Sequence, residues 1–436
     1  MAHMLWRRVE KLHLAARAAI LAAVLLPGLS PGGAGAAEIA IACSALGQEQ
    51  EHCRVGAEAW AERTGNSVKL VSTPGSASEQ LALYQQLLAA GVDDIDVFQI
   101  DVVWPGILAR HFIDLSAAAG DRPAGHFEAI IANNTVEGRL VAMPWFADAG
   151  LLYYRADLLE KHARPVPETW AELTETARIV QEGERAAGNG GFWGHVWQGR
   201  AYEGLTTNAL EWISSHGGGT FVDEDGEVTV NNPAAARALE LAAGWVGSIS
   251  PEGVLNYTEE EARGVFQSGH ALFMRNWPYA WALAQSADSP VRGRVGIALL
   301  PRGGDDGRHS ATLGGQQLAV SRYSAHPELA ADLVMHLTSR EEQKRRAVLG
   351  SFNPTIPDLY DDPGIAEAVP VIAQLREILD HAVPRPSSVT GADYNRVSAA
   401  IFDAVHRVLS GRAEAEDSLA RLERELERIG RRGWRR

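Results

Sequence analysis

Residues 95–100 read IDVFQI, a short and largely apolar run that is typical of a β-strand. They complete an alternating series of strand and helix patterns, which runs through 38–42, 49–63, 68–72 and 76–90. A β-α-β-α-β series predicts a parallel sheet with helices on its faces, which is an α/β fold. Proteins of this class bind ligands in crevices at the carboxyl ends of their strands. The series therefore predicts the fold class and the edge of the sheet where a site should lie.

Pairs of residues that cap helices mark further helix starts. In a capping box, a Ser or Thr at the N-cap exchanges hydrogen bonds with a Glu three residues later. The pairs with this spacing are Ser76 with Glu79, Thr169 with Glu172 and Thr258 with Glu261. Segments 294–300 and 317–320 read as strands, and segment 393–429 reads as helix with an interruption near Gly411.

The length and charge of the chain limit its architecture and its partners. A chain of 436 residues is too long for one hydrophobic core and predicts two domains. Its 46% hydrophobic and 22% charged residues are those of an ordinary globular protein. The net charge of -15 and the pI of about 5.4 argue against binding to nucleic acid, which requires a basic surface.

The first 37 residues have the layout of a secretory signal peptide. Basic residues up to Arg17 precede an apolar run at 18–26, and small residues at 32–37 predict cleavage near Ala36 or Ala37. The alternative is a short membrane anchor, but the apolar run is shorter than the roughly 20 residues of a spanning helix. The sequence therefore predicts an exported, periplasmic protein.

Export bears on the two cysteines, Cys43 and Cys53. In an oxidising compartment such a pair predicts a disulfide, which would join the end of the first strand to the first helix. A bridge over so short a loop stabilises the fold by up to about 3 kcal/mol. The alternatives are two buried thiols and, less favoured because no further Cys or His lies at ligand spacing, a metal site. We expect no metal and no cofactor.

Common catalytic motifs are absent from the sequence. It contains no GxxxxGK[ST] phosphate loop, no GxSxG nucleophile elbow and no HExxH zinc motif. Asp96, Asp101 and Asp148 could instead supply the paired carboxylates of an exported glycoside hydrolase. Carboxylates also bind sugar hydroxyls without catalysis, by accepting charge-assisted hydrogen bonds. These residues therefore leave an enzyme and a binding protein open.

Three segments interleave aromatic with polar side chains. They read RNWPYAW at 275–281, MPWFADAG at 143–150 and GFWGHVWQG at 191–199. The C–H groups of a pyranose lie flat against an indole, and its hydroxyl rim needs polar partners because unpaired buried hydroxyls are costly. Each segment alone also fits simple core packing. Together, in an exported α/β chain, they indicate a carbohydrate site.

Longer stretches resemble the periplasmic solute-binding proteins of sugar ABC importers, and within them the trehalose/maltose and α-glucoside binders. The resemblance covers nearly the whole mature chain and includes DVFQIDVVWPG, MPWFADAGLLYYRADLLEK, MRNWPYAW, ATLGG and AVPRP. It implies a non-enzymatic protein with two α/β lobes, the type II fold of maltose-binding protein, and a ligand cleft between them. The lobes would take 38–146 with 299–343 and 147–298 with 344–436, and a monomer would deliver its sugar to a membrane permease.

The resemblance also implies roles for individual residues. Glu49, Asp101 and Asp148 would accept hydrogen bonds from hydroxyls, Trp277 would stack on a glucose ring, and Arg385 would donate to hydroxyls. Backbone N–H at Gly315 would lie close to the sugar, and the cleft walls would include Phe146, Trp104, Tyr279 and Gln198. Alternatively, Trp104 and Tyr279 simply pack, and Asp101 caps the following helix.

One position departs from the family pattern. Related disaccharide binders have an aromatic residue after the paired glycines, where this chain has Gln316. The change removes a stacking face, worth about 1 kcal/mol, and adds an amide that can donate and accept hydrogen bonds. Trehalose and maltose are the leading ligands, and another sugar, a polyol or a modified glucoside is the alternative.

Overall fold

The computed structural model describes residues 36–304 and 306–434. The predicted signal peptide therefore lies almost wholly outside the described residues. Residues 38–436 form one unit, and the following description concerns that unit alone. Among the described residues, no helix combines the length and the apolar character that crossing a bilayer requires.

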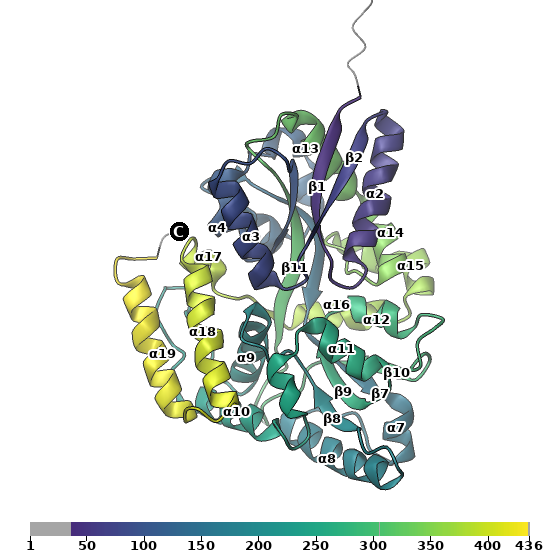
Figure 1. The fold of residues 1–436 in the computed structure, drawn as a ribbon, viewed down its shortest axis with the longest axis vertical. Coiled ribbons are helices and arrows are strands. Elements are labelled where there is room, and N and C mark those ends of the chain that lie inside the picture. Colours follow the sequence, from purple (N-terminus) through teal and green to yellow (C-terminus); the bar gives the residue numbers. More distant parts are fainter. Residues whose placement is uncertain (1–35, 305, 435–436) are drawn as a thin grey trace, which may run out of the picture. The chain divides into compact units, whose positions relative to one another are not determined.

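The first lobe is built on a mixed sheet whose strands follow the order β12-β11-β3-β1-β2, with β6 paired to β11 outside this path (Figure 1). Its strands are β1 (Glu38–Ser44), β2 (Ser67–Thr73), β3 (Val97–Asp101), β6 (Met143–Ala149), β11 (Ala311–Val320) and β12 (Ala382–Val383). Strand β1 is parallel to β2 and β3, as the alternating series predicts. Strand β11 runs antiparallel to β3 and β6.

The second lobe is built on a smaller mixed sheet with the order β10-β7-β9-β8. Its strands are β7 (Leu151–Arg155), β8 (Trp193–Val196), β9 (Ala271–Asn276) and β10 (Val295–Ala298). Strand β7 is antiparallel to both neighbours, and β8 is parallel to β9. Strands β4 (Thr135–Val136) and β5 (Arg139–Leu140) form a separate short hairpin.

Helices cover both sheets (Figure 1). Up to the end of the first sheet's β11, they are α2 (Glu49–Thr64), α3 (Ala77–Ala89), α4 (Pro105–Leu108), α5 (Ser116–Ala119), α6 (Glu128–Asn133), α7 (Ala156–Lys161), α8 (Trp170–Ala186), α9 (Glu203–Ser215), α10 (Pro233–Trp245), α11 (Glu259–Gln267) and α12 (Tyr279–Ala284). After β11 come α13 (Pro327–Leu337), α14 (Arg340–Gly350), α15 (Pro363–Ala368), α16 (Ile372–Asp380), α17 (Ser387–Thr390), α18 (Tyr394–Leu409) and α19 (Ala415–Gly430). The 3-10 turns in the described part of the chain are η1 (Ala109–His111), η2 (Arg122–Gly125), η3 (Glu252–Asn256) and η4 (Pro357–Asp361).

The chain crosses between the two sheets at Gly150, which separates the end of β6 from the start of β7. A Cβ atom at this position would lie 2.1 Å from Glu211 Oε1 and 2.5 Å from Arg275 Nη2. Those two side chains form a buried ion pair, so the crossing strand can approach it only because the residue is glycine. The crossing places Asp148 and Trp277 near the junction of the lobes.

The local signals in the sequence have mixed outcomes. Cys43 and Cys53 form the predicted disulfide between β1 and α2. Thr169 and Glu172 form the predicted capping box at α8. The capping box predicted at Ser76 and Glu79 is wrong, because the Ser76 side chain makes no cap hydrogen bond.

Candidate functional site

A small polar cavity lies between the lobes, where the carboxyl ends of strands β1 and β3 meet the first turns of helices α9 and α11. Its volume is about 50 Å³, and its lining residues are Ser44, Leu46, Glu49, Gly75, Ala77, Gln80, Asp101, Asp148, Glu203, Gly204, Thr207, Glu259, Trp277, Tyr279, Gly314, Gly315, Gln316 and Arg385. Sites for small organic ligands usually enclose roughly 300–1,000 Å³. The lobes or the lining side chains must therefore move apart before a sugar can enter.

Most of the predicted site residues meet at this cavity. Those in its lining are Glu49, Asp101, Asp148, Trp277, Tyr279, Gly315, Gln316 and Arg385. The other three lie elsewhere. The Trp104 ring packs edge-on against Tyr84 with ring centroids 5.9 Å apart, and the Phe146 ring packs against Phe352 at 4.7 Å. Gln198 is fully buried and donates from Nε2 to the Arg275 carbonyl at 3.0 Å.

Glu49 and Asp148 are two of the buried carboxyl groups that line the cavity and form no ion pair with a described residue. Glu49 is 3% exposed, and its Oε2 accepts a hydrogen bond from Gln99 Nε2 at 2.5 Å. Asp148 is 9% exposed, and its Oδ1 accepts no hydrogen bond from any described residue. Burial raises the pKa of Glu49 to about 8 and the pKa of Asp148 to about 7. Each carboxyl group can accept a hydrogen bond from a ligand hydroxyl in either protonation state, and each can also donate one while it is protonated.

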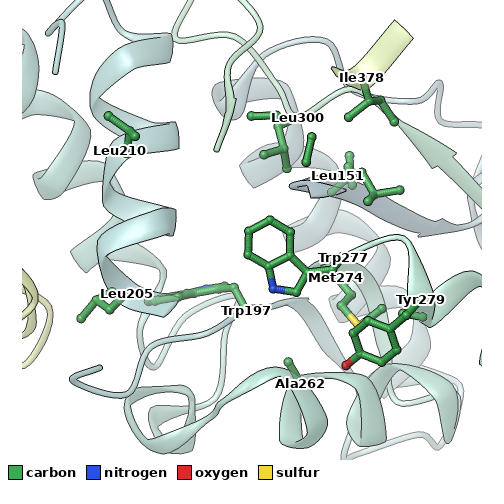
Figure 2. Packing of buried hydrophobic residues seen from close by; sticks show 14 of the residues in the cluster. Leu151, Trp197, Leu205, Leu210, Ala262, Met274, Trp277, Tyr279, Leu300 and Ile378 are labelled. Atoms are coloured by element: carbon green, nitrogen blue, oxygen red, sulfur yellow. The ribbon is translucent and has the colours of Figure 1, made fainter. Parts of the chain in front are cut away.

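The guanidinium of Arg275 packs against one face of the Trp277 indole and fixes its orientation. The Arg275 guanidinium carbon lies 3.9 Å from the centroid of the indole ring, and Arg275 is itself fixed by two hydrogen bonds to Glu211 at 2.9 and 2.5 Å. The indole Nε1 donates to Glu259 Oε1 at 3.4 Å. Figure 2 shows Trp277 beside Met274 and Tyr279 among buried hydrophobic side chains. The ring is thus a platform whose orientation is set before any ligand arrives.

Strand β11, which pairs with β6, brings Gly315 and Gln316 to the same cavity. Gly315 has φ of 120°, and a Cβ atom there would lie 2.4 Å from the Phe146 carbonyl oxygen. Only glycine therefore lets β11 approach β6 at this point. Gln316 lies opposite Asp101 in the register of β11 and β3, and its Oε1 accepts no hydrogen bond from any described residue. This amide oxygen is a further acceptor beside the two carboxyl groups.

Several contacts join the lobes around the cavity. Arg200 forms an ion pair with Glu79 of α3 at 2.7 Å, which explains why Glu79 does not cap its own helix. The Glu203 backbone N–H donates to Ser78 Oγ at 3.0 Å. Gly47, with φ of 52°, lies against the Tyr279 ring, where a Cβ would come within 2.5 Å. The lobes are therefore in a closed arrangement around the cavity.

Sequence reasoning missed two acidic residues of the lining, Glu203 and Glu259. Each is the first residue of a helix, α9 and α11 respectively, and each is less than 10% exposed. Burial raises the pKa of both carboxyl groups. Acidic residues are common in first helical turns because they complement the helix dipole, so the sequence alone does not distinguish them from ordinary surface residues.

A second cavity of about 620 Å³ is larger but chemically unlike the first. Its lining includes Ala147 and Leu313, whereas their neighbours Asp148 and Gly314 line the polar cavity. Adjacent residues of a strand point to opposite faces, so the two cavities lie on opposite faces of β6 and β11. The larger one is lined mostly by aliphatic side chains; its one carboxyl group is that of Asp380, and it lacks an indole, whereas the smaller cavity combines several buried carboxyl groups with Trp277. We therefore assign the candidate site to the smaller cavity.

The cavity is rich in carboxyl groups, but its described lining shows no metal site. Among the described residues, no three His, Cys, Asp or Glu side chains are arranged to hold a metal ion. Its chemistry is that of five carboxyl groups, one guanidinium and one indole, which can hold a polyhydroxylated ligand by hydrogen bonds and stacking.

Comparison with known proteins gives consistent matches. The family model described as bacterial extracellular solute-binding protein matches residues 54–344. A probable ABC transporter-binding protein of Deinococcus radiodurans is 51% identical over 92% of this chain and 95% of its own length. Maltose-bound MalE3 of T. maritima, a solved structure, is 39% identical with a TM-score of 0.85, covering 90% of this chain and 100% of that chain. The GacH receptor of Streptomyces glaucescens, at 23% identity and a TM-score of 0.80, covers 91% of this chain and 99% of its own and supports the fold alone.

Proposed function

Because the chain belongs to the family of bacterial extracellular solute-binding proteins, which are not enzymes, we propose that it captures an α-glucoside in the cavity between its lobes. Trehalose and maltose are the leading ligands. The observation that carries this proposal is the meeting of a fixed indole, Trp277, with the buried carboxyl groups of Glu49 and Asp148, neither of which forms an ion pair with a described residue.

This combination suits a pyranose for two physical reasons. The flat C–H face of the sugar can cover the exposed side of the Trp277 ring, since Arg275 occupies the other side. The hydroxyl rim can donate hydrogen bonds to Asp148 and Gln316, each of which has a buried oxygen without a donor among the described residues, and to the remaining lone pairs of the Glu49 carboxyl group. A ligand lacking either feature would leave buried groups unsatisfied.

Delivery to a membrane permease follows from the two-lobe arrangement. The contacts of Glu79 with Arg200 and of Ser78 with Glu203 join the two lobes in the closed arrangement. A ligand that bridges the lobes would favour this arrangement, and a permease can recognise it. We propose lobes of 38–146 with 299–343 and of 147–298 with 344–436, an exported monomer, and cleavage of the signal peptide near Ala36 or Ala37.

A second candidate ligand is another sugar, a polyol or a glucoside with an additional polar group. Gln316 favours it, because its amide oxygen is buried at the cavity without a hydrogen-bond donor among the described residues. A substituent that donates to this oxygen would gain an interaction that trehalose need not make.

A calorimetric titration panel tests the proposal. The purified mature protein is titrated with trehalose, maltose, maltotriose, glucose and mannitol at pH 7.5. We expect an α-linked disaccharide to bind with a dissociation constant near 1 μM, about -8 kcal/mol. Tighter binding of mannitol or glucose than of either disaccharide would favour the second candidate. Absence of heat for every compound would reject a carbohydrate function.

A further inference from the structure

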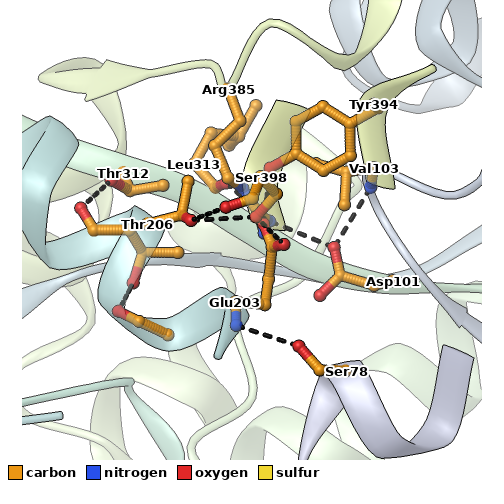
Figure 3. A network of polar contacts seen from close by, with 12 residues as sticks. Ser78, Asp101, Val103, Glu203, Thr206, Thr312, Leu313, Arg385, Tyr394 and Ser398 are labelled. Carbon is orange, nitrogen blue, oxygen red and sulfur yellow. Dashed lines mark hydrogen bonds and ion pairs between the residues drawn. The ribbon is translucent and has the colours of Figure 1, made fainter. Parts of the chain in front are cut away.

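Arg385 lies between two carboxylates that belong to different lobes (Figure 3). It follows β12, and its side chain is almost fully buried. Its Nη1 donates to Glu203 Oε1 at 2.7 Å and its Nη2 donates to Asp101 Oδ1 at 3.0 Å. Asp101 ends β3 of the first lobe, whereas Glu203 begins α9 in the second lobe. The guanidinium is therefore shared between the lobes.

Glu203 is the firmly held end of this bridge. Its Oε1 also accepts a hydrogen bond from the Tyr394 hydroxyl at 2.5 Å, and its Oε2 accepts one from Ser398 Oγ at 2.6 Å. Both donors come from α18, and the position at the start of α9 adds the favourable field of a helix N-terminus. Because protein donors already occupy both oxygens, Glu203 is better placed to hold Arg385 than to hold a sugar.

Asp101 is held less completely. Its Oδ1 accepts the bond from Arg385 and a second from the Val103 backbone N–H at 3.1 Å. Arg385 therefore meets Asp101 through a single oxygen. An unrestrained guanidinium would instead form the stronger two-pronged pair with this carboxylate.

We propose that Glu203 is a positioning residue of the sugar site, which anchors Arg385 so that Asp101 keeps acceptor capacity for a ligand hydroxyl. The inference rests on the proposed function. Without the anchor, Arg385 turns onto both oxygens of Asp101 and withdraws that carboxylate from the cavity. The arrangement of one cation between two anions then determines whether the cavity offers the Asp101 carboxylate to the ligand in addition to Glu49 and Asp148.

A double-mutant cycle on Glu203→Gln and Arg385→Gln tests the proposal by calorimetry with the disaccharide that binds the wild type best. We expect Glu203→Gln alone to weaken binding about tenfold or more. In the Arg385→Gln background, Glu203→Gln should weaken binding by less than about threefold, because the guanidinium that Glu203 anchors is no longer present. Additive losses would mean that Glu203 contacts the sugar directly and would overturn the proposal.

A matched control separates positioning from general stability. Glu342 on α14 is also buried and ion-paired, with Arg345 Nη2 at 2.7 Å, but it does not line the cavity. Glu342→Gln should lower the melting temperature and leave the dissociation constant unchanged. If Glu203→Gln behaves in this same way, Glu203 is merely structural and the proposal is wrong.

A measurement without ligand distinguishes a failure of this inference from a failure of the proposed function. In a crystal structure of ligand-free Glu203→Gln, we expect Arg385 to contact both Oδ1 and Oδ2 of Asp101. A guanidinium that stays on Oδ1 alone would overturn the inference even if sugars bind. If the protein binds no sugar at all, the proposed function fails, and this structure still decides whether Glu203 restrains Arg385.

A second variant covers the case in which Glu203→Gln does not fold. Tyr394→Phe with Ser398→Ala removes two hydrogen bonds to Glu203 and keeps its charge and the packing of the ring. We expect the same direction of change in sugar affinity, with a smaller size. Unchanged affinity in this folded variant would contradict the proposal.

Discussion

Truncation of Trp277 to alanine tests the stacking platform on which the proposed function depends. A tryptophan side chain buries about 150–250 Å². If a sugar ring covers roughly a third of that area, about 60 Å², then burial at ~25 cal/mol per Å² contributes ~1.5 kcal/mol to binding. The loss of the ring should therefore weaken binding at least tenfold. Arg275 and Glu259 would also lose their neighbour, so the measured loss should exceed this figure.

Stability must be measured beside affinity in this variant. Removing a buried tryptophan costs about 3–5 kcal/mol of folding free energy wherever it lies. Trp245→Ala is the matched control, because Trp245 is 1% exposed, donates from Nε1 to Thr174 Oγ1 at 2.8 Å and does not line the cavity. Both variants should melt earlier in calorimetric scans, and only Trp277→Ala should lose affinity in titrations at a temperature where both are folded. An unchanged dissociation constant in folded Trp277→Ala would refute the stacking role.

Three other predictions follow from the same structure. Burial raises the pKa of Glu49 to about 8 and that of Asp148 to about 7, so these two groups bind more protons in the folded protein than in the unfolded chain. The free energy of unfolding should therefore fall as pH rises from about 7 to 8, above the range in which the buried His52, His126 and His195 take up protons on unfolding. Chemical denaturation that shows rising stability over this window would contradict the prediction. Sugar hydroxyls that donate to the two carboxyl groups favour their charged forms, so titrations at pH 7 in buffers of different ionisation enthalpy should show proton release, and proton uptake would count against the proposed contacts. Replacing both Cys43 and Cys53 with alanine should lower the unfolding free energy by about 3 kcal/mol with little change in sugar affinity, and a large loss of affinity would link the disulfide to the site.

Much of the fold is predictable because its signals are local. The strands and helices between residues 38 and 101 follow from apolar runs and from helix ends such as Gly65, which adopts the left-handed conformation that ends α2. The capping box at Thr169 forms for the same reason. Ser76 shows the limit of local reasoning, since Glu79 instead binds Arg200, a residue 121 positions away.

The site is predictable only where resemblance supplies long-range information. Trp277, Glu49 and Asp148 meet at the cavity because β9, α2 and β6 are brought together by sheet pairings that no single segment specifies. Phe146 turns away from the cavity lining toward Phe352, which lies 206 positions further along the chain. The sequence did not indicate a role for Glu203, because that role depends on its contact with Arg385, 182 positions away. Long-range partners therefore decide which polar residues become functional.

A crystal structure of the protein with bound trehalose or maltose tests the central claim most directly. We predict one glucose ring stacked on the face of Trp277 opposite Arg275, with hydroxyls within hydrogen-bond distance of Glu49 and Asp148. We also predict that Asp101 still meets Arg385 through one oxygen. A disaccharide found in the larger aliphatic cavity behind β6 and β11, or a complex in which Trp277 makes no contact with sugar, would contradict the claim.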